Sequence, residues 1–144
     1  MNKEVSLNHD VPHRTIWAEL SPGSGKVIIT IPRIGRLDGL FWTERGELKP
    51  AVFVEYYSVN PDVKGQGWGK RLLQILADES RQHEIQRIEG RFYTPESLGA
   101  LAGALGVESI QFMDHGRIIE MSYDEAMEAA KTTGLNYTAS VDLE

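Results

Sequence analysis

Residues 51–70 of the chain read AVFVEYYSVNPDVKGQGWGK, and the predicted fold is built outward from this stretch. Its first part, Ala51–Val59, is rich in β-branched and aromatic side chains, which predicts a strand. Its second part, residues 64–70, places three glycines directly before an apolar pattern with helical spacing. The sequence therefore predicts a strand that runs through a glycine-rich turn into a helix.

The predicted strand Ala51–Val59 has apolar or aromatic side chains at both odd and even positions. A strand of this kind is covered on both faces and lies in the middle of a sheet. Glu55 is a carboxylate within this run, and burial there would make it a base able to take a proton from an amine, directly or through water. The alternative is that Glu55 pairs with a basic side chain or reaches solvent at a bulge.

Further elements follow from periodicity and turn residues on both sides of this stretch. Before it, we expect a loose arm, three strands and a polar turn, at residues 1–15, 15–20, 26–31, 36–42 and 44–47. After it, we expect a helix, a strand, a second helix, a hairpin and a terminal helix, at residues 67–82, 87–93, 97–105, 109–113 with 117–121, and 126–131. The last ten residues of the chain are expected to be a tail.

The order of these elements predicts one α+β domain over residues 1–144, with its core at about residues 16–134. The strand 51–59, the helix 67–82 and the strand 87–93 form a crossover unit, so these two strands are expected to be parallel. Short turns join most of the other strands, which are expected to be antiparallel. The predicted sheet is therefore mixed, with one parallel pair.

Composition limits the classes of function. No cysteine is present, which excludes disulfides and a thiol nucleophile. The net charge of −6 and the absence of a run of Lys or Arg argue against nucleic acid as a partner. No apolar segment is long enough to span a membrane, so no membrane partner and a cytoplasmic location are expected. The four histidines show no metal-ligand spacing, so no metal is expected.

The glycine-rich turn is a candidate anion site. The first N–H groups of a helix lack partners, and the helix dipole favours an anion beside them. Glycines let a pyrophosphate approach the main chain, and Lys64 or Lys70 can neutralise part of its charge. The dinucleotide fingerprint Gly-x-Gly-x-x-Gly does not fit, because Lys70 stands where its third glycine would be. A turn that binds no ligand remains the alternative.

Residues 64–69, Lys-Gly-Gln-Gly-Trp-Gly, resemble the acetyl-CoA loop of the GNAT family of N-acetyltransferases, Arg/Gln-x-x-Gly-x-Gly/Ala. The resemblance extends from about Ala51 to Ile75. It implies a GNAT-like twisted mixed sheet, mainly antiparallel, with helices on both faces but without clear N-terminal helices at the acceptor site. It also implies acetyl-CoA as the cofactor, with the pantetheine arm at Val59. The implied pyrophosphate site consists of Lys64, Gly65, Gln66, Gly67, Trp68, Gly69 and Lys70.

The resemblance is weaker beyond Tyr93. Ser97 stands where many members carry an asparagine that contacts the cofactor. Members commonly carry a tyrosine in the following helix as general acid for the leaving CoA thiolate, but residues 98–105 contain none. Tyr57 and Tyr93 are candidates to replace it, and for each the alternative is ordinary aromatic packing.

These residues predict an acetyl-CoA-dependent N-acetyltransferase that transfers an acetyl group directly to a primary amine, with Glu55 as base and Tyr57 as acid. The acceptor is an amine-bearing small molecule or protein, and the net charge suggests that it binds in an acidic groove. Residues 22–50 contain no amphipathic helix, so the acceptor side is either open or completed by a second copy in a homodimer. The alternatives are a CoA-binding sensor or scaffold that catalyses nothing, and an interaction module that binds no cofactor.

Overall fold

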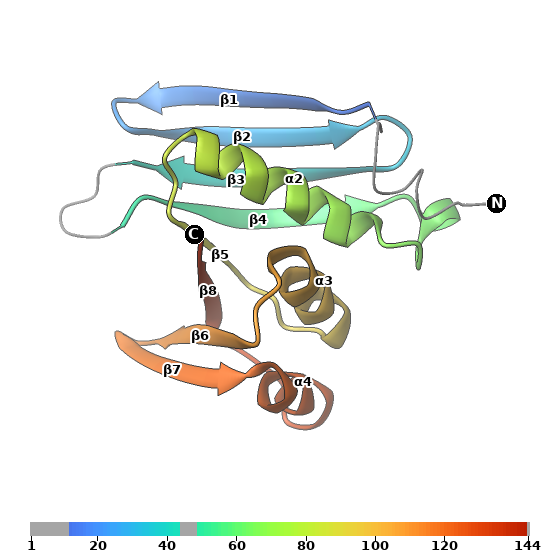
Figure 1. Cartoon of the computed structure of the whole chain (residues 1–144), viewed down its shortest axis with the longest axis vertical. Coiled ribbons are helices and arrows are strands. Elements are labelled where there is room, and N and C mark those ends of the chain that lie inside the picture. The colour runs from blue at the N-terminus through green and yellow to red at the C-terminus, as the bar shows by residue number, and fades with distance from the viewer. Residues whose placement is uncertain (1–11, 44–48, 144) are drawn as a thin grey trace.

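The computed structural model describes residues 12–43 and 49–143, and in this part of the chain eight strands form a sheet (Figure 1). The strands lie in the order β1-β2-β3-β4-β5-β8-β6-β7. Their bounds are β1 Arg14–Ser21, β2 Ser24–Ile31, β3 Gly35–Trp42, β4 Ala51–Val59, β5 Arg87–Gly90, β6 Ser109–Asp114, β7 Arg117–Ser122 and β8 Thr138–Asp142. The helices of the described ranges are the 3-10 helix η1 Pro61–Val63 and the α-helices α2 Trp68–Gln82, α3 Pro95–Leu105 and α4 Tyr123–Thr132.

The pairing of the strands confirms the predicted mixed sheet. Strands β1 to β4 form an antiparallel meander, and β4 and β5 are the parallel pair among the described strands. Helix α2 connects these two strands, as a parallel crossover requires. Strand β8 pairs antiparallel with both β5 and β6, and β6 pairs antiparallel with β7. The α+β fold class is thus confirmed.

The bounds of the elements close to the glycine-rich loop agree with the sequence to within a few residues. Strand β4 spans Ala51–Val59, as predicted. Helix α2 begins at Trp68, because Gly67 is its N-cap and has a left-handed backbone with φ 88°. Strand β5 ends at Gly90 and does not continue to Tyr93. The predicted arm up to residue 11 and the predicted turn at residues 44–47 lie outside the described residues.

Helix α2 is fixed to the sheet along its whole length. Its apolar side packs on β2, β3 and β4, where Leu72 and Leu37 are among the fully buried side chains of one core cluster. Near its C-terminal end, the carboxylate of Glu79 accepts hydrogen bonds from Thr15 Oγ1 at 2.7 Å and from Trp17 Nε1 at 2.9 Å. The helix therefore joins the edge strand β1 to the central strands.

The described helices share one side of the sheet. Val52 of β4, Ile88 of β5 and Phe112 of β6 are fully buried on this side, in one cluster with Ala126 of α4. Helix α2 lies across β2 to β4 in Figure 1, α3 packs against α2, and α4 packs against α3. The expectation of helices on both faces is therefore wrong for the described residues. The physical reason is that residues 24–42 form two strands, so they supply no helix for the second face.

The face of β1 to β4 that lies opposite α2 is called the open face below. The strand registers place the following side chains on it: Arg14, Ile16, Lys26, Ile28, Arg36, Asp38, Leu40, Phe53 and Tyr56. Three of its large apolar or aromatic side chains are exposed, with relative exposures of 49% for Ile16, 37% for Leu40 and 50% for Tyr56.

The prediction that the last ten residues form a tail is wrong. Residues Thr138–Asp142 form β8, which lies between β5 and β6. Ala139, Ser140 and Val141 are buried there, at 0%, 2% and 5% relative exposure. The C-terminal strand therefore completes the sheet, and without it β5 and β6 would each lose a hydrogen-bonded neighbour.

Adjacent residues of β8 provide a test of its structural role. Val141→Ala should lower the free energy of unfolding by about 1–3 kcal/mol, because it leaves a cavity in the core. Asp142→Ala is the matched control on the opposite face. There the half-exposed carboxylate of Asp142 forms ion pairs with Lys49 and Arg87. It should change stability by less than about 1 kcal/mol. Equal effects in urea denaturation would show that β8 is not part of the cooperative core.

Candidate functional site

A cavity of about 1030 Å³ opens where the chain after β5 separates from β4. Its lining comes from the second half of β4, the glycine-rich loop with the first turn of α2, the residues after β5 and the start of α3. The lining residues are 54–59, Lys64, Gly65, Gly67–Lys70, 91–94, Glu96, Ser97, Gly99 and Ala100. The structure thus brings together the candidate catalytic residues Glu55 and Tyr57 and every candidate cofactor-binding residue except Gln66.

The cavity exists because β4 contains a β-bulge. The register of β3 and β4 shifts between Asp38, which pairs with Tyr56, and Gly39, which pairs with Val54, so Glu55 is the extra residue. Strand β5 pairs with β4 only along residues 51–54. Beyond the bulge, no described strand lies on the side of β4 that faces away from β3. Main-chain N–H and C=O groups of this edge therefore lack ladder partners and can bind an extended ligand.

Asn60 fixes the way in which the chain leaves β4. Its backbone N–H donates to Ile34 O at 2.7 Å, and its side-chain Nδ2 donates to Arg33 O at 3.1 Å. Its Oδ1 accepts a hydrogen bond from the N–H of Asp62 at 3.0 Å and so caps η1. These bonds hold the start of the glycine-rich loop against the turn between β2 and β3.

The glycine-rich loop leaves the first turn of α2 open to a ligand. Gly65 and Gly67 have left-handed backbones, with φ 81° and 88°, and no atom lies within 4 Å of the place where a Cβ would stand. The first backbone hydrogen bond that enters the helix runs from Arg71 N–H to Gly67 O at 3.0 Å. The N–H groups of residues 68–70 therefore have no partner within the helix. They point out of its N-terminal end, which is also the positive end of the helix dipole. This geometry fits an anion such as a pyrophosphate.

Two lysines add positive charge at this helix start. Lys64 and Lys70 are exposed and form no ion pair with a described residue. The aliphatic stem of Lys70 crosses α3 at Gly103, where a Cβ would lie 3.5 Å from Lys70 Cε. The ammonium group of Lys70 is thus held at the junction of α2 and α3, where it can neutralise part of an anion's charge.

Trp68 is 6% exposed and belongs to the core cluster, so it packs the start of α2 on the sheet. Its indole N–H is buried and has no hydrogen-bond partner among the described residues. Trp68 also lines the cavity. The side chain therefore anchors α2 and at the same time forms part of the cavity wall.

Tyr57 lies on the helix side of β4, beneath the start of α2. Its Cε2 would be 3.0 Å from a Cβ placed on Gly69, so this glycine makes room for the tyrosine ring. The ring of Phe92 lies beside it, with 6.3 Å between the ring centres. Burial raises the pKa of Tyr57 from 10.0 to about 12, so the phenol stays protonated at neutral pH. It can donate a proton or a hydrogen bond into the cavity but cannot act as a base there.

The shifted pKa of Tyr57 has a measurable effect on stability. The phenol ionises near pH 10.0 when the chain is unfolded but only near a pKa of about 12 when it is folded. The folded state then binds more protons between these values, so stability is complete below pH 10.0 and falls as pH rises toward 12. Tyr57→Phe should therefore show a smaller loss of stability over this range in pH-dependent urea denaturation. Tyr56→Phe, at an exposed position, is the control and should behave like the unaltered protein.

Glu55 does not lie in a buried position. It is exposed, because the bulge turns it out of the ladder. The expectation of a buried carboxylate is thus wrong, and the alternative, a carboxylate that reaches solvent at a bulge, is the one found. The bulge also changes the alternation of side chains: Val54 and Tyr57 both lie on the helix side, while Tyr56 lies on the open face. Glu55 still lines the cavity, at the point where β4 loses its second neighbour.

Ser97 lines the cavity, but its side chain takes part in the N-cap of α3. Its hydroxyl accepts a hydrogen bond from Thr94 N–H at 3.1 Å and donates to Thr94 O at 3.0 Å, while its own N–H donates to Thr94 Oγ1 at 3.1 Å. This capping box holds the start of α3 at the edge of the cavity. Ser97 therefore positions the helix whether or not it contacts a cofactor.

Sequence reasoning missed several residues of the cavity wall, among them Arg91 and Phe92. The predicted strand over 87–93 assigned them to the sheet. The glycine at position 90 was a signal in the sequence for the earlier strand end. In the structure, Gly90 is buried next to Phe92, whose ring carbon Cε2 would lie 2.7 Å from a Cβ at position 90. Glycine in a strand often marks such a close approach or a bend.

Within residues 12–43 and 49–143, no group of three or more His, Cys, Asp or Glu side chains is placed to hold a metal ion. In the same ranges, no helix combines the length and the apolar character needed to cross a membrane.

A mixed sheet that opens between two parallel strands, beside a glycine-rich helix start, defines a GNAT-like α+β domain. Residues 34–102 match the Acetyltransferase (GNAT) family, and this range includes β4, the glycine-rich loop, α2, β5 and most of α3. The segment that builds the cavity is thus the part of the chain that matches this family.

Similar solved structures include N-acetylglutamate synthase from Neisseria gonorrhoeae complexed with coenzyme A and N-acetyl-glutamate, with 14% identity, a TM-score of 0.49, and coverage of 83% of this chain and 26% of that one. A tandem GNAT protein from the clavulanic acid biosynthesis pathway has 16% identity and a TM-score of 0.45, and the match covers 67% of this chain and 34% of that one. A cAMP-binding acyltransferase from Mycobacterium smegmatis has 17% identity and a TM-score of 0.41, with coverage of 77% and 39%. This chain thus spans well under half the length of these three proteins. No curated protein matches the chain.

Proposed function

We propose that this protein is an acetyl-CoA-dependent N-acetyltransferase that transfers an acetyl group directly to a primary amine. The observation that carries the proposal is the meeting, in one cavity, of the open edge of β4 with the unpaired N–H groups at the start of α2. The edge suits an extended amide-bearing arm, and the helix start suits a pyrophosphate. Coenzyme A combines these two chemical features in one molecule.

The described residues fit this cofactor. Lys64, Gly65 and Gly67–Lys70 would hold the pyrophosphate, because their N–H groups and charges converge on open space. The β4 edge up to Val59 would hold the pantetheine arm through main-chain hydrogen bonds. The bound thioester would supply an acyl carbon that is activated toward an amine. Its reactive end would then lie toward the bulge at Glu55.

Two side chains of β4 carry the proposed proton transfers. Glu55 would accept a proton from the attacking amine, directly or through one water, as the new C–N bond forms. Tyr57 would donate a hydrogen bond to the sulfur as the C–S bond breaks and the CoA thiolate leaves, since burial raises the pKa of its phenol to about 12 and so keeps it protonated. Glu55 is the exposed bulge residue and Tyr57 lies on the helix side of β4, and these different surroundings suit the opposite roles.

A CoA-binding sensor or scaffold is the second candidate. It is favoured by the absence of a tyrosine from residues 98–105 and by the capping role of Ser97. It would share the cofactor site with the enzyme but would show no turnover with any amine.

The cofactor site can be tested by thermal unfolding with and without acetyl-CoA. At one hundred times the dissociation constant, a ligand adds about 2.7 kcal/mol to the stability of the folded state. Gly67→Ala should reduce this shift, because the substitution strains the left-handed loop and places a methyl group in the cofactor space. Gly106→Ala is the matched control, since Gly106 also has a positive φ, of 65°, but ends α3 outside the cavity. An unaltered protein without any shift would contradict cofactor binding.

Catalysis can be tested by the release of free CoA thiol in the presence of amines. Glu55→Gln should lower kcat at least tenfold while leaving the acetyl-CoA melting shift intact, because positioned general bases contribute about 10²–10⁴-fold. Glu96→Gln is the matched control, an exposed carboxylate of the same cavity on α3, and should retain its rate. A melting shift without turnover would favour the sensor, and equal rates in the two variants would remove Glu55 from the mechanism.

A further inference from the structure

The open face begins at the mouth of the cavity. Tyr56 lines the cavity and has its side chain on this face. Arg91 also lines the cavity, and its guanidinium carbon lies 5.9 Å from the centre of the ring of Phe53, another residue of the open face. The glycine-rich loop approaches the cavity from the opposite side, next to α2. The open face is thus the surface beside Glu55 over which an acceptor can approach a bound cofactor.

The open face is cationic, although the whole chain carries a net charge of −6. Arg14 and Lys26 are exposed on it and form no ion pair with a described residue. Arg91 at the cavity mouth is also exposed and without such a pair. The carboxylate of Asp38 is held by Arg36 through two hydrogen bonds of 2.6 and 3.0 Å, so these two charges neutralise each other.

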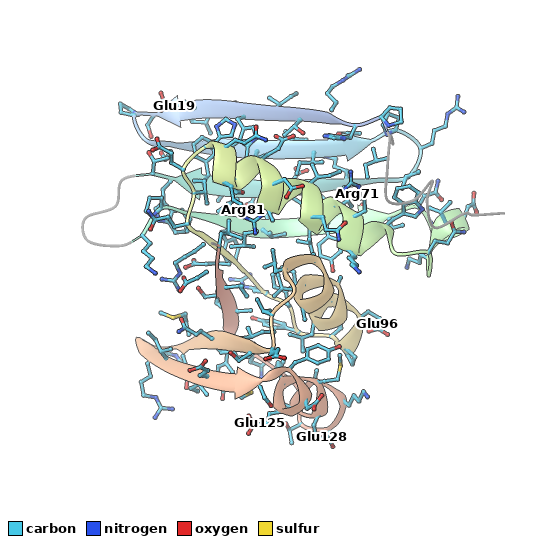
Figure 2. The ribbon with its side chains drawn as sticks, viewed as in Figure 1. Glu19, Arg71, Arg81, Glu96, Glu125 and Glu128 are labelled. Atoms are coloured by element: carbon cyan, nitrogen blue, oxygen red, sulfur yellow. The ribbon has the colours of Figure 1, made fainter. Side chains whose placement is uncertain are left out.

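Besides Asp38, the acidic side chains next to the open face are Glu55 at the cavity mouth and Glu89, which lies beside Phe53 and pairs with Arg87. Other acidic side chains lie farther away. Glu125 and Glu128 project from α4, at the end of the molecule opposite to β1, and Glu96 projects outward at α3 (Figure 2). The acidic acceptor groove expected from the net charge is therefore not found on the described part of the open face. The local charge would repel a polycation and attract an anionic partner, since the effect is decided within about one Debye length of 8–10 Å.

The open face also offers apolar contacts that a small acceptor would leave unused. Ile16, Leu40 and Tyr56 are exposed on it at 49%, 37% and 50%. The strand registers place Ile28 between Ile16 and Asp38, and Phe53 next to Leu40, so these side chains are neighbours across four strands. Adjacent strands are about 4.8 Å apart, so the surface extends some 14 Å from the cavity mouth. Exposed apolar surface bordered by charge is typical of a docking site for another polypeptide.

We propose that the open face binds the acceptor, and that the acceptor is a polypeptide in which acidic and apolar residues flank the acetylated amine. The inference rests on the proposed acetyltransferase function and names the substrate class of that site. The apolar residues of the acceptor pack on Ile16, Leu40 and Tyr56, while its carboxylates meet Lys26 and Arg91. The charge complementarity and the continuity of this surface with the cavity both point to the acceptor as its occupant.

The experiment compares matched peptides that each carry one free amine, either at the N-terminus or on a single lysine. One peptide has acidic and apolar flanking residues, a second has the acidic residues replaced by arginine, and spermidine and free amino acids complete the panel. Release of CoA thiol should show a kcat/KM for the acidic peptide at least tenfold above that for the arginine peptide. The difference should shrink as salt is raised from 20 to 500 mM. Over this range the Debye length falls roughly threefold or more, so exposed charges are screened more strongly.

Variants of the open face locate the effect. Lys26→Glu should lower kcat/KM for the acidic peptide about fivefold or more and raise it for the arginine peptide, because the interaction of rim charges changes sign. Leu40→Ser should weaken binding of both peptides, measured by fluorescence anisotropy. Neither residue lines the cavity, so the acetyl-CoA melting shift should stay unchanged in both variants. Lys131→Glu is the matched charge-reversal control on α4 and should leave peptide preference unaltered.

The failure of this inference is distinguishable from the failure of the proposed function. Equal or better turnover of spermidine or the arginine peptide would overturn the acceptor class while leaving the acetyltransferase intact. Binding of the acidic peptide without any turnover would retain the docking surface and remove the enzyme activity. A dimer in analytical ultracentrifugation that Tyr56→Asp dissociates would also overturn the inference, because the open face would then be covered by a second copy of the chain.

Discussion

The β-bulge at Glu55 is the constraint on which the rest of the site depends. Before the bulge, β4 pairs with β3 on one side and β5 on the other, and after it only β3 remains. A bulge bends its strand and increases the local twist, which separates β4 from the chain after β5. The opening creates the cavity and leaves the β4 edge free for a ligand. The same extra residue changes the alternation of side chains, so that Tyr57 lies beneath α2 and Tyr56 on the open face.

Helix α2 supplies the second part of the site, and its position is set by ordinary core packing. Leu72, Leu73 and Leu76 are fully buried, and Glu79 joins the far end of the helix to β1. An anion site made of N–H groups is effective only when those groups are held in place before the ligand arrives. The packed helix provides this order, while the left-handed backbones of Gly65 and Gly67 keep the approach free of side chains. The proposed cofactor site is thus a product of the core as much as of the loop.

The distribution of charge separates the two sides of the proposed reaction. Lys64 and Lys70 lie at the helix start, where a pyrophosphate would bind, and Arg91 and Lys26 lie toward or on the open face. The net charge of −6 says nothing about either place, because short-range electrostatics depend on the charges within a few ångströms. The open face is available because residues 24–42 form the strands β2 and β3, so no described helix covers it.

The sequence by itself determined the elements around the loop. The β-branched run Ala51–Val59 and the helical spacing after Gly67 are local signals, and both appear in the structure where they were predicted. The parallel pairing of β4 and β5 followed from them, because a helix between two strands requires a crossover. The residues of the proposed pyrophosphate site were also visible, since a glycine-rich helix start is contiguous in sequence.

Only the tertiary structure decided the place of β8, the exposure of Glu55 and the character of the open face. Residues Thr138–Asp142 are small or polar and give a weak local strand signal, but insertion between β5 and β6 buries three of them. The bulge inserts one residue into β4, and no residue type in the sequence signals it, so the sequence placed Glu55 in a buried position where the structure exposes it. In each case the physical reason is the same: burial and facing depend on pairing partners that lie far away in the sequence, and a local pattern does not contain them.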